Sequence, residues 1–543
     1  MTAPPDPRQL IQALAAEAVT DPDAAMGRCQ QILQRAPDSL PVLCIAAGIE
    51  RRYGRFDAAA ELLGRAATVD AEAAPVLAEC AALAIAQQAF DLAADKLRAL
   101  LRKHPEQLDS WFNLGLAEEQ RGRDPAAIEA FETLLEKAPN GYPAASARLA
   151  LLLASAGRDE DARQHIDQAL AIAPEHLEVR YARGMLLLAS GDTDQALSHF
   201  RHCVNRQPRL VGAWQQLLEC RRITDPDDPE LSSARKLLQE PDIGAIEREQ
   251  LALAIGKALN DLQQYDAAFD CFSQAKQARR ARLPRFDREA WRKDTDARIA
   301  ASEPTSPFVP DAAVRPVFIV GMPRSGTTLV DQILTAHREA GGVGEVAFFD
   351  QPAEQFYSTG LTPDTAGGLR AGYLRKLAGN RVATVSNKYP ANFRHLSLLR
   401  WLLPEARFVH VRRSALDTCL SVFFQDFPYG NRFANDLEDI AAYYRDYRRL
   451  MAHWAVDKED VFELSYEALL EDQAGVTRQL LDFCGLDWDP ACLDFTRNPR
   501  AVGTLSRWQV RQPVYASSVG RWRHYQSRLA PLIAALGPWA DSD

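Results

Sequence analysis

The chain has 543 residues, of which 47% are hydrophobic and 25% are charged, with a formal net charge of −10. This length allows two or three domains of ordinary globular composition, and the acidic balance gives no support to nucleic-acid binding. The nine cysteines are scattered and form neither a zinc motif nor a disulfide framework, which indicates a reducing compartment.

No targeting or membrane segment is predicted. Residues 1–7 have no basic flank and no apolar stretch, so they do not read as a secretory signal. No uninterrupted apolar run reaches the roughly 18 residues that a membrane span needs. We therefore expect a cytoplasmic protein with no membrane or nucleic-acid partner.

The first half of the chain is an internal repeat. Prolines recur with gaps of 68, 34, 35 and 34 residues, at Pro37, Pro105, Pro139, Pro174 and Pro208. One interval also has bulky and small residues at fixed offsets, namely Trp111, Leu114, Gly115, Ala127 and Phe131. Small residues return where two helices must approach closely, at Ala59, Ala93, Ala127, Ala162 and Ala196. A period of 34 residues with helix–turn–helix units is the tetratricopeptide signature.

The pattern predicts an α-helical solenoid over residues 8–240. Such an array stacks into a superhelix with a concave groove, which we expect to bind a protein or peptide acceptor. The alternative is an array that serves as a spacer or that associates with itself in a homodimer.

A further helical unit of the same kind is predicted over residues 241–300. Gly256, Ala268, Phe272 and Ala275 repeat the same offsets, out of phase with the array. The turn-rich segment 224–229 precedes this unit and predicts a bend or break in the superhelix. The basic run 279–293 is interleaved with acidic residues, so we interpret it as a solvated helix face.

Residues 301–313 are punctuated by prolines and predict a linker, and residues 314–543 then alternate between strand and helix patterns. Strands are predicted at residues 317–320, 382–385, 407–411 and 461–464. Alternation of this kind predicts an α/β domain with a parallel sheet and a ligand at the carboxyl ends of its strands.

A glycine loop follows the first of these strands and precedes a helix that begins at Thr327. It approaches the nucleotide-triphosphatase pattern G-x-x-x-x-G-K-[ST], in that Gly321, Gly326 and Thr328 fit. Thr327 occupies the lysine position, so a triphosphate would be poorly neutralised. The loop predicts an anion site for a smaller group, a 5′-phosphate that carries one further substituent.

The loop reads Pro323, Arg324, Ser325, Gly326, Thr327, Thr328 and Leu329. This motif resembles the 5′-phosphosulfate-binding loop of sulfotransferases that use 3′-phosphoadenosine 5′-phosphosulfate (PAPS). Within that family the surrounding residues resemble the protein-tyrosine sulfotransferases. The resemblance implies a P-loop-like parallel sheet with flanking helices, PAPS as co-substrate and no metal.

The resemblance also assigns a second anion pocket for the 3′-phosphate. Arg413 and the serine eight residues later, Ser421, match the family's spacing. Arg412 precedes Arg413, and the sequence leaves open which arginine makes the contact. The remaining cofactor positions by resemblance are Tyr466, Ser506 and Arg521.

For the chemistry, the resemblance makes Glu345 the base for the acceptor hydroxyl and Arg324 and Lys388 the cations at the transferred and leaving groups. We expect Glu345 and Lys388 to serve opposite ends of the transfer axis. His395 and His410 are rival bases that we interpret as structural.

The predicted function is transfer of a sulfuryl group from PAPS to an acceptor hydroxyl, with protein tyrosine as the first choice. The alternatives are a sulfotransferase for a saccharide, a lipid or a small phenol, and a non-catalytic adaptor that binds nucleotide. The complete set of site residues argues against the adaptor, and the absent loop lysine argues against a nucleotide kinase.

Overall fold

The computed structural model describes residues 7–301, 305–311, 313–427, 431–455, 459–495 and 518–541. The chain divides into two compact units, Met1–Leu186 and Leu187–Asp543. The domain boundaries predicted from the sequence, after residues 240, 300 and 313, are not tested by this division into compact units and stay predictions. Within the described ranges, no helix combines the length and the apolar character needed to cross a bilayer.

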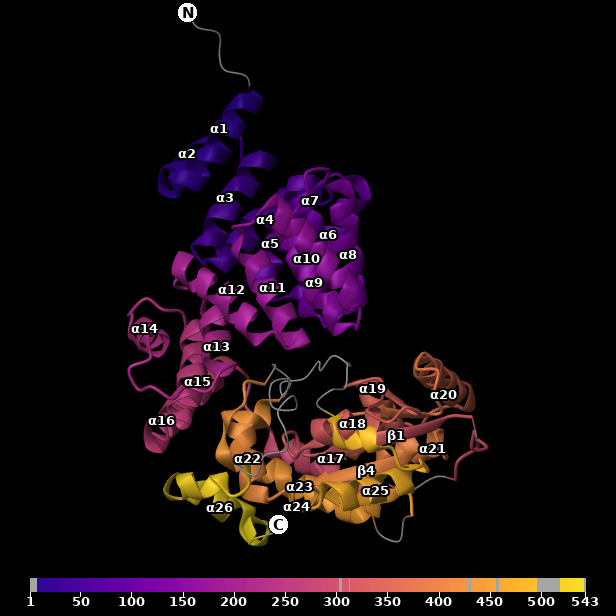
Figure 1. Cartoon of the computed structure of the whole chain (residues 1–543). Helices are drawn as coiled ribbons and strands as arrows, with labels where there is room; N and C mark the ends of the chain where they lie inside the picture. The colour runs from indigo at the N-terminus through magenta and orange to yellow at the C-terminus, as the bar shows by residue number, and fades with distance from the viewer. Residues whose placement is uncertain are drawn as a thin grey trace, which may run out of the picture. The chain divides into compact units, whose positions relative to one another are not determined.

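The first unit is built from antiparallel helix pairs (Figure 1). Its helices are α1 (Pro7–Thr20), α2 (Pro22–Arg35), α3 (Leu40–Arg52), α4 (Phe56–Asp70), α5 (Ala74–Ala86), α6 (Phe90–Lys103), α7 (Leu108–Gln120), α8 (Asp124–Lys137), α9 (Pro143–Ser155) and α10 (Asp159–Ile172). The chain passes from the first unit to the second within α11 (Leu177–Ser190). Helices α3 and α4, α5 and α6, α7 and α8, and α9 and α10 pack as pairs.

The repeat residues explain this pairing. A Cβ at Gly115 would lie 2.4 Å from the ring of Phe131, so the glycine of one helix makes room for the aromatic ring of the next. The five alanines predicted at close helix approaches are all fully buried. The side chains of Trp111 and Arg180 each donate a hydrogen bond to the carbonyl of the repeat proline six residues earlier, at 3.0 and 2.6 Å. The predicted helical repeat is confirmed.

The second unit begins with further helices, α12 (Thr193–Arg206), α13 (Val211–Glu219), α14 (Pro229–Leu238), α15 (Ala245–Asp261), α16 (Tyr265–Arg282) and α17 (Arg288–Ala300). Helices α15 and α16 pack as a repeat pair, and a Cβ at Gly256 would lie 3.0 Å from the ring of Phe272. This is the same glycine–phenylalanine contact as in the first unit, at the offset that the sequence predicted.

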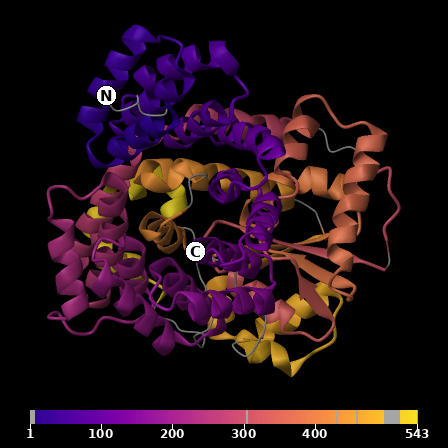
Figure 2. The same ribbon diagram turned by 90° about the horizontal axis from the view of Figure 1, so that it is seen from above.

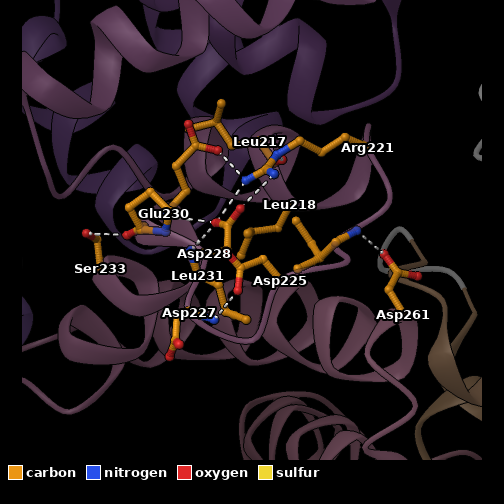
Figure 3. A network of polar contacts seen from close by, with 12 residues as sticks. Leu217, Leu218, Arg221, Asp225, Asp227, Asp228, Glu230, Leu231, Ser233 and Asp261 are labelled. Atoms are coloured by element: carbon orange, nitrogen blue, oxygen red, sulfur yellow. Dashed lines mark hydrogen bonds and ion pairs between the residues drawn. The ribbon is translucent and has the colours of Figure 1, made fainter.

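The turn-rich segment 224–229 is closed by charged side chains (Figure 3). The guanidinium of Arg221 donates two hydrogen bonds to Asp228, at 2.8 and 2.9 Å, and also pairs with Glu230. Asp228 in turn accepts the backbone N–H groups of Glu230 and Leu231, at 3.0 and 2.9 Å, and so caps α14. This network fixes the turn between α13 and the short helix α14.

A parallel five-stranded sheet forms the centre of the rest of the second unit, with its strands side by side in Figure 2. The strands are β1 (Arg315–Gly321), β2 (Ala340–Gly342), β3 (Thr384–Asn387), β4 (Arg407–Arg412) and β5 (Val461–Ser465), in the order β2-β3-β1-β4-β5. The four pairings between neighbouring strands of this sheet are parallel. The predicted α/β class is confirmed.

Further helices lie on and around this sheet. They are α18 (Thr327–Thr335), α19 (Asp350–Ser358), α20 (Pro363–Ala378), α21 (Leu396–Leu402), α22 (Ala415–Phe424), α23 (Leu437–Ala455), α24 (Tyr466–Glu471), α25 (Gln473–Cys484) and α26 (Ala530–Leu536). Short 3-10 segments are η1 (Pro390–His395), η2 (Arg432–Asn435), η3 (Pro490–Leu493), η7 (Arg521–Arg528) and η8 (Gly537–Asp541). Val317 and Ile319 of β1 pack with α18 and α25, whereas Phe318 points to the other face and contacts Tyr373 and Phe408.

The basic run 279–293 forms the solvated face that the sequence predicted only in part, since Arg285, Arg292 and Lys293 are exposed. Four of its arginines pair with acids on other elements: Arg279 with Glu249 and Asp426, Arg280 with Asp436, Arg282 with Glu249, and Arg288 with Asp436, Glu438 and Asp439. The pair Lys293–Glu289 is local and exposed, as expected. The prediction was wrong for these four arginines because most of their acidic partners lie far downstream in the sequence, just after α22 and at the start of α23.

Candidate active site

The glycine loop between β1 and α18 has an unusual backbone. Gly321 and Gly326 have φ of +151° and +106°, and Arg324 between them has φ of +73°. A Cβ at Gly321 would lie 2.6 Å from the carbonyl oxygen of Val411, and one at Gly326 would lie 2.5 Å from the ring of Tyr466. Glycine is therefore required at both positions. A non-glycine residue with positive φ is uncommon, and such backbone strain concentrates at functional sites.

The hydroxyl groups of this loop are buried. Ser325, Thr327 and Thr328 are 1%, 4% and 8% exposed. Among the described residues, the Ser325 Oγ has no hydrogen-bond partner. Because buried hydroxyls are normally hydrogen-bonded, an unpaired one beside the start of a helix is a donor that an oxyanion would satisfy.

Two arginines lie against the loop. The Nε of Arg324 donates to the Oγ of Ser421 at 3.2 Å. Arg413 donates to the carbonyl of Arg324 at 3.2 Å and to that of Ser518 at 2.5 Å, and its guanidinium lies 4.9 Å from the centre of the Tyr466 ring. The Nε of Arg413 is buried without a hydrogen-bond partner in the described part of the chain.

Arg412 lies elsewhere. Its guanidinium pairs with Glu463 of the neighbouring strand at 3.1 Å. The strand alternation thus sends the two consecutive arginines to different surroundings, and Arg413 is the one beside the loop and Ser421. The sequence left open which of the two arginines contacts the 3′-phosphate, and this geometry favours Arg413.

Lys388 and Glu345 lie next to each other. The Nζ of Lys388 forms an ion pair with Glu345, and the Lys388 side chain is 1% exposed, whereas the Glu345 side chain is 44% exposed. The backbone N–H of Lys388 also donates to the carbonyl of Gly344 at 3.0 Å, which continues the β2–β3 pairing into the loop. The two side chains are thus in direct contact in this structure, and the expectation that they serve opposite ends of the transfer axis stays a prediction.

The strand before Lys388 was predicted two residues too early. The side chains at its end are polar yet fully buried: Ser386 donates to Asp331, and Asn387 donates to the hydroxyl of Tyr373 and the carbonyl of Val346, both at 3.1 Å. An apolar pattern cannot reveal a strand of this kind. These bonds fix the strand end that presents Lys388.

The two histidines considered as bases are enclosed by other side chains. His395 lies 2.8 Å from Asp350 and His410 lies between Glu463, at 3.1 Å, and the hydroxyl of Tyr447, at 2.5 Å. Burial lowers the pKa of His395 to about 4 and also lowers the pKa of His410. This placement supports the interpretation of both as structural.

The remaining predicted cofactor residues are placed unequally. Tyr466 lies under Arg413, and its hydroxyl is 3.0 Å from the Oγ of Ser518. Arg521 donates to the side-chain oxygen of Asn260 at 2.8 Å and lies over the ring of Phe424, so these contacts are with α15 and α22. Ser506 lies outside the described residues.

Sequence reasoning missed Asp417. This buried carboxylate of α22 accepts the backbone N–H groups of Gly520 and Trp522, at 2.6 and 2.9 Å, and so ties the C-terminal segment to the helix that carries Ser421. Nothing in the local sequence marks it, because its partners lie about a hundred residues downstream.

Comparison with known proteins agrees with this arrangement. Residues 316–366 and 369–490 match the sulfotransferase family, and residues 81–142, 120–186 and 177–210 match tetratricopeptide repeats. The chain therefore carries tetratricopeptide repeats in its N-terminal region and a sulfotransferase-family domain in its C-terminal region.

Individual relatives are distant. An uncharacterized protein of Aquifex aeolicus (strain VF5) is 30% identical over 341 residues, which is 57% of this chain and 44% of that protein. Protein-tyrosine sulfotransferase A of Caenorhabditis elegans is 22% identical over 241 residues, which is 40% of this chain and 61% of that enzyme. The chain thus spans less than two thirds of either relative.

Among solved structures, the sulfotransferase domain of the Synechococcus PCC 7002 olefin synthase is 20% identical, with a TM-score of 0.31, and the match covers 41% of this chain and 90% of that domain.

Proposed function

We propose that this protein is a PAPS-dependent sulfotransferase that acts on an acceptor hydroxyl, with protein tyrosine as the first acceptor to test. The observation that carries the proposal is the adjacency of two anion-binding elements. The loop with the unpaired Ser325 hydroxyl and the second anion pocket of Arg413 and Ser421 are joined through Arg324, which contacts both.

The side chains fit a ligand with two separated anionic groups. The loop residues Pro323–Thr328 would hold the 5′-phosphosulfate, with the Ser325 hydroxyl as a donor that has no other partner among the described residues. Arg413 and Ser421 would hold the 3′-phosphate, since a guanidinium fork and a hydroxyl suit a phosphate. Tyr466 and the carbonyl of Ser518 both contact Arg413 and would hold its guanidinium in place for this role. PAPS supplies an activated sulfuryl group, and the chain supplies its position and its charge balance.

In the proposed reaction the acceptor oxygen forms a bond to sulfur while the bond from sulfur to the bridging phosphate oxygen breaks. Lys388 exchanges its carboxylate partner for oxygens at the leaving side, and the freed Glu345 accepts the proton of the acceptor hydroxyl. Arg324 balances charge on the transferred group. Transfer of this kind needs positioning and electrostatic stabilisation more than covalent chemistry by the protein.

The choice of a protein acceptor is supported by the repeats, whose grooves commonly bind peptides, and by the activity that the name of the Caenorhabditis elegans relative states. The nine cysteines without a pairing pattern support a reducing compartment, and we propose the cytoplasm.

The test is to incubate the full chain with ³⁵S-labelled PAPS and a lysate of its own host, and to separate protein from small molecules. We expect label in protein that alkaline hydrolysis and amino-acid separation assign to tyrosine sulfate. Label only in small molecules would refute the protein acceptor, and no transfer above that of the lysate without the added protein would refute the enzymatic proposal.

A further inference from the structure

The last repeat pair, α15 and α16, is called here the repeat hairpin. It has the glycine–phenylalanine contact of a repeat, yet it contacts the sulfotransferase part of the same compact unit. Its contacts include the last turn of α22, which carries Ser421, and the residues that follow that turn.

The repeat hairpin closes the C-terminal end of α22. The ring of Phe272 stacks on that of Phe424, which lies three residues after Ser421, with the ring centres 3.9 Å apart. One turn further along α16, the Nζ of Lys276 donates to the carbonyl of Gln425, the residue that ends α22, at 2.7 Å. Lys276 is 2% exposed, so this contact is made inside the protein.

Arg279 extends the closure. It donates to the carbonyl of Phe427 at 2.8 Å and pairs with Asp426. Lys276 and Arg279 therefore bind backbone carbonyls of residues 425–427, the segment that directly follows the last turn of α22.

The repeat hairpin also holds the segment that follows the site. Asn260 of α15 accepts from Arg521 and from the hydroxyl of Tyr525, both at 2.8 Å. The same segment is bound to α22 through Asp417, and it contains Ser518, whose carbonyl accepts from Arg413. Both residues of the second anion pocket are thus held by groups that the repeat hairpin contacts.

We propose that the repeat hairpin positions the second anion pocket, with Lys276 as a positioning residue that fixes the last turn of α22. This inference rests on the proposed function. It assigns recognition of the 3′-phosphate in part to the helical repeats, whereas the loop that would hold the 5′-phosphosulfate depends on β1 and α18.

The physical reason is the position of Ser421 on its helix. It lies three residues before the end of α22, in the last turn, which Gln425 ends by donating its backbone N–H to the carbonyl of Val422. If the Lys276 amine is removed, Gln425 at the end of this turn loses its bond to α16, and the Ser421 hydroxyl loses its fixed position opposite Arg324. The N-terminal half of the helix keeps its own contacts through Asp417.

The test compares two ligands that differ by one phosphate. Isothermal titration gives the dissociation constants of 3′-phosphoadenosine 5′-phosphate and of AMP for the full chain and for Lys276→Met. We expect the wild-type protein to prefer the bisphosphate by about 10- to 100-fold, the value of one charge-assisted phosphate contact. Lys276→Met should reduce this preference severalfold or more and leave the AMP constant within twofold.

The matched control is Lys257→Met. Lys257 also lies on the repeat hairpin and also donates to the carbonyls at a helix end, those of Leu218 and Arg221, but the helix it caps is α13. This variant should keep the wild-type preference.

A folded Lys276→Met protein with the wild-type preference would overturn the inference, as would equal weakening of both ligands. If Lys276→Met does not fold, Phe272→Leu, which breaks the stack on Phe424, carries the same test. A wild-type protein with no preference for the bisphosphate would instead refute the proposed function, which separates the two failures.

Discussion

The ion pair between Glu345 and Lys388 makes a sharp prediction about the catalytic base. Replacing Glu345 by glutamine removes the proposed proton acceptor but keeps an amide oxygen for the Lys388 ammonium. Loss of a general base costs roughly 10²–10⁴ in rate, so we expect turnover to fall by that factor. Binding of 3′-phosphoadenosine 5′-phosphate should stay the same or tighten, because the neutral amide competes less well than a carboxylate for Lys388.

Because the two side chains are unequally buried, we expect different stability costs when either one is replaced alone. Lys388 is buried and Glu345 is half-exposed, so Glu345→Ala leaves a buried donor without this partner, at a cost of about 1–3 kcal/mol of unfolding free energy. Lys388→Met leaves a carboxylate that water can reach, so it should cost less stability but should lower the rate and weaken cofactor binding.

The assay measures the initial rate of label transfer from ³⁵S-labelled PAPS to the acceptor fraction that the wild-type protein labels. Calorimetry gives the affinity for the bisphosphate, and denaturant unfolding gives the stability. Near-normal turnover by Glu345→Gln would refute the assignment and move the base elsewhere. Equal destabilisation by Glu345→Ala and Lys388→Met would refute the argument from burial.

Three further predictions concern the repeats, the loop and a buried acid. Removing residues 1–186, the first compact unit, should leave bisphosphate binding within about twofold but impair transfer to the natural acceptor. Removing residues 1–300, which includes the repeat hairpin, should abolish selectivity for the bisphosphate. Calorimetry on both truncations tests this, and unchanged selectivity after the longer removal would show that the repeats are dispensable for bisphosphate binding. Gly326→Ala should cost about 1–3 kcal/mol of stability and weaken binding, because its Cβ would clash with Tyr466, while Gly360→Ala, with a similar positive φ but open space around it, should leave binding unchanged in the same titration. Burial raises the pKa of Glu219 to about 7, against the opposing hydrogen bond from Gln215, so the folded state binds more protons than the unfolded state between about pH 4.5 and 7. The free energy of unfolding that depends on this group therefore falls as the pH rises through that window. Glu219→Gln should gain stability relative to wild type from pH 5 to pH 8, and a stability difference that is constant with pH would refute this.

The repeats and the sheet could be predicted because their signals are local. The 34-residue period, the glycine–phenylalanine offset and the apolar strands at 317–320 and 407–411 each depend on residues close in sequence, and each is present in the structure. The strand β2 was missed because Ala340–Gly342 has little intrinsic strand preference and forms through pairing with β3.

The contacts that arrange the candidate site could not be predicted in the same way. Asp417 and Arg279 have partners about a hundred residues or more downstream, and a charge pattern alone does not distinguish a solvated arginine from one that pairs across the fold. The basic run was misjudged for this reason. Tertiary ion pairs override the local expectation where two elements must be held in register.

Three features of the glycine loop are unfavourable or unusual for a stable turn, and all three are consistent with an anion site. Arg324 has a backbone conformation that glycine would adopt more easily, Ser325 is buried without a partner in the described chain, and Thr327 replaces the lysine of a triphosphate loop. A sequence selected only for stability would relieve the first two, since positive φ and an unpaired buried hydroxyl each cost free energy. Their coincidence within four residues, beside Arg413, is what an anion site requires, because the bound anion would satisfy the hydroxyl and offset the strain of the backbone that presents it.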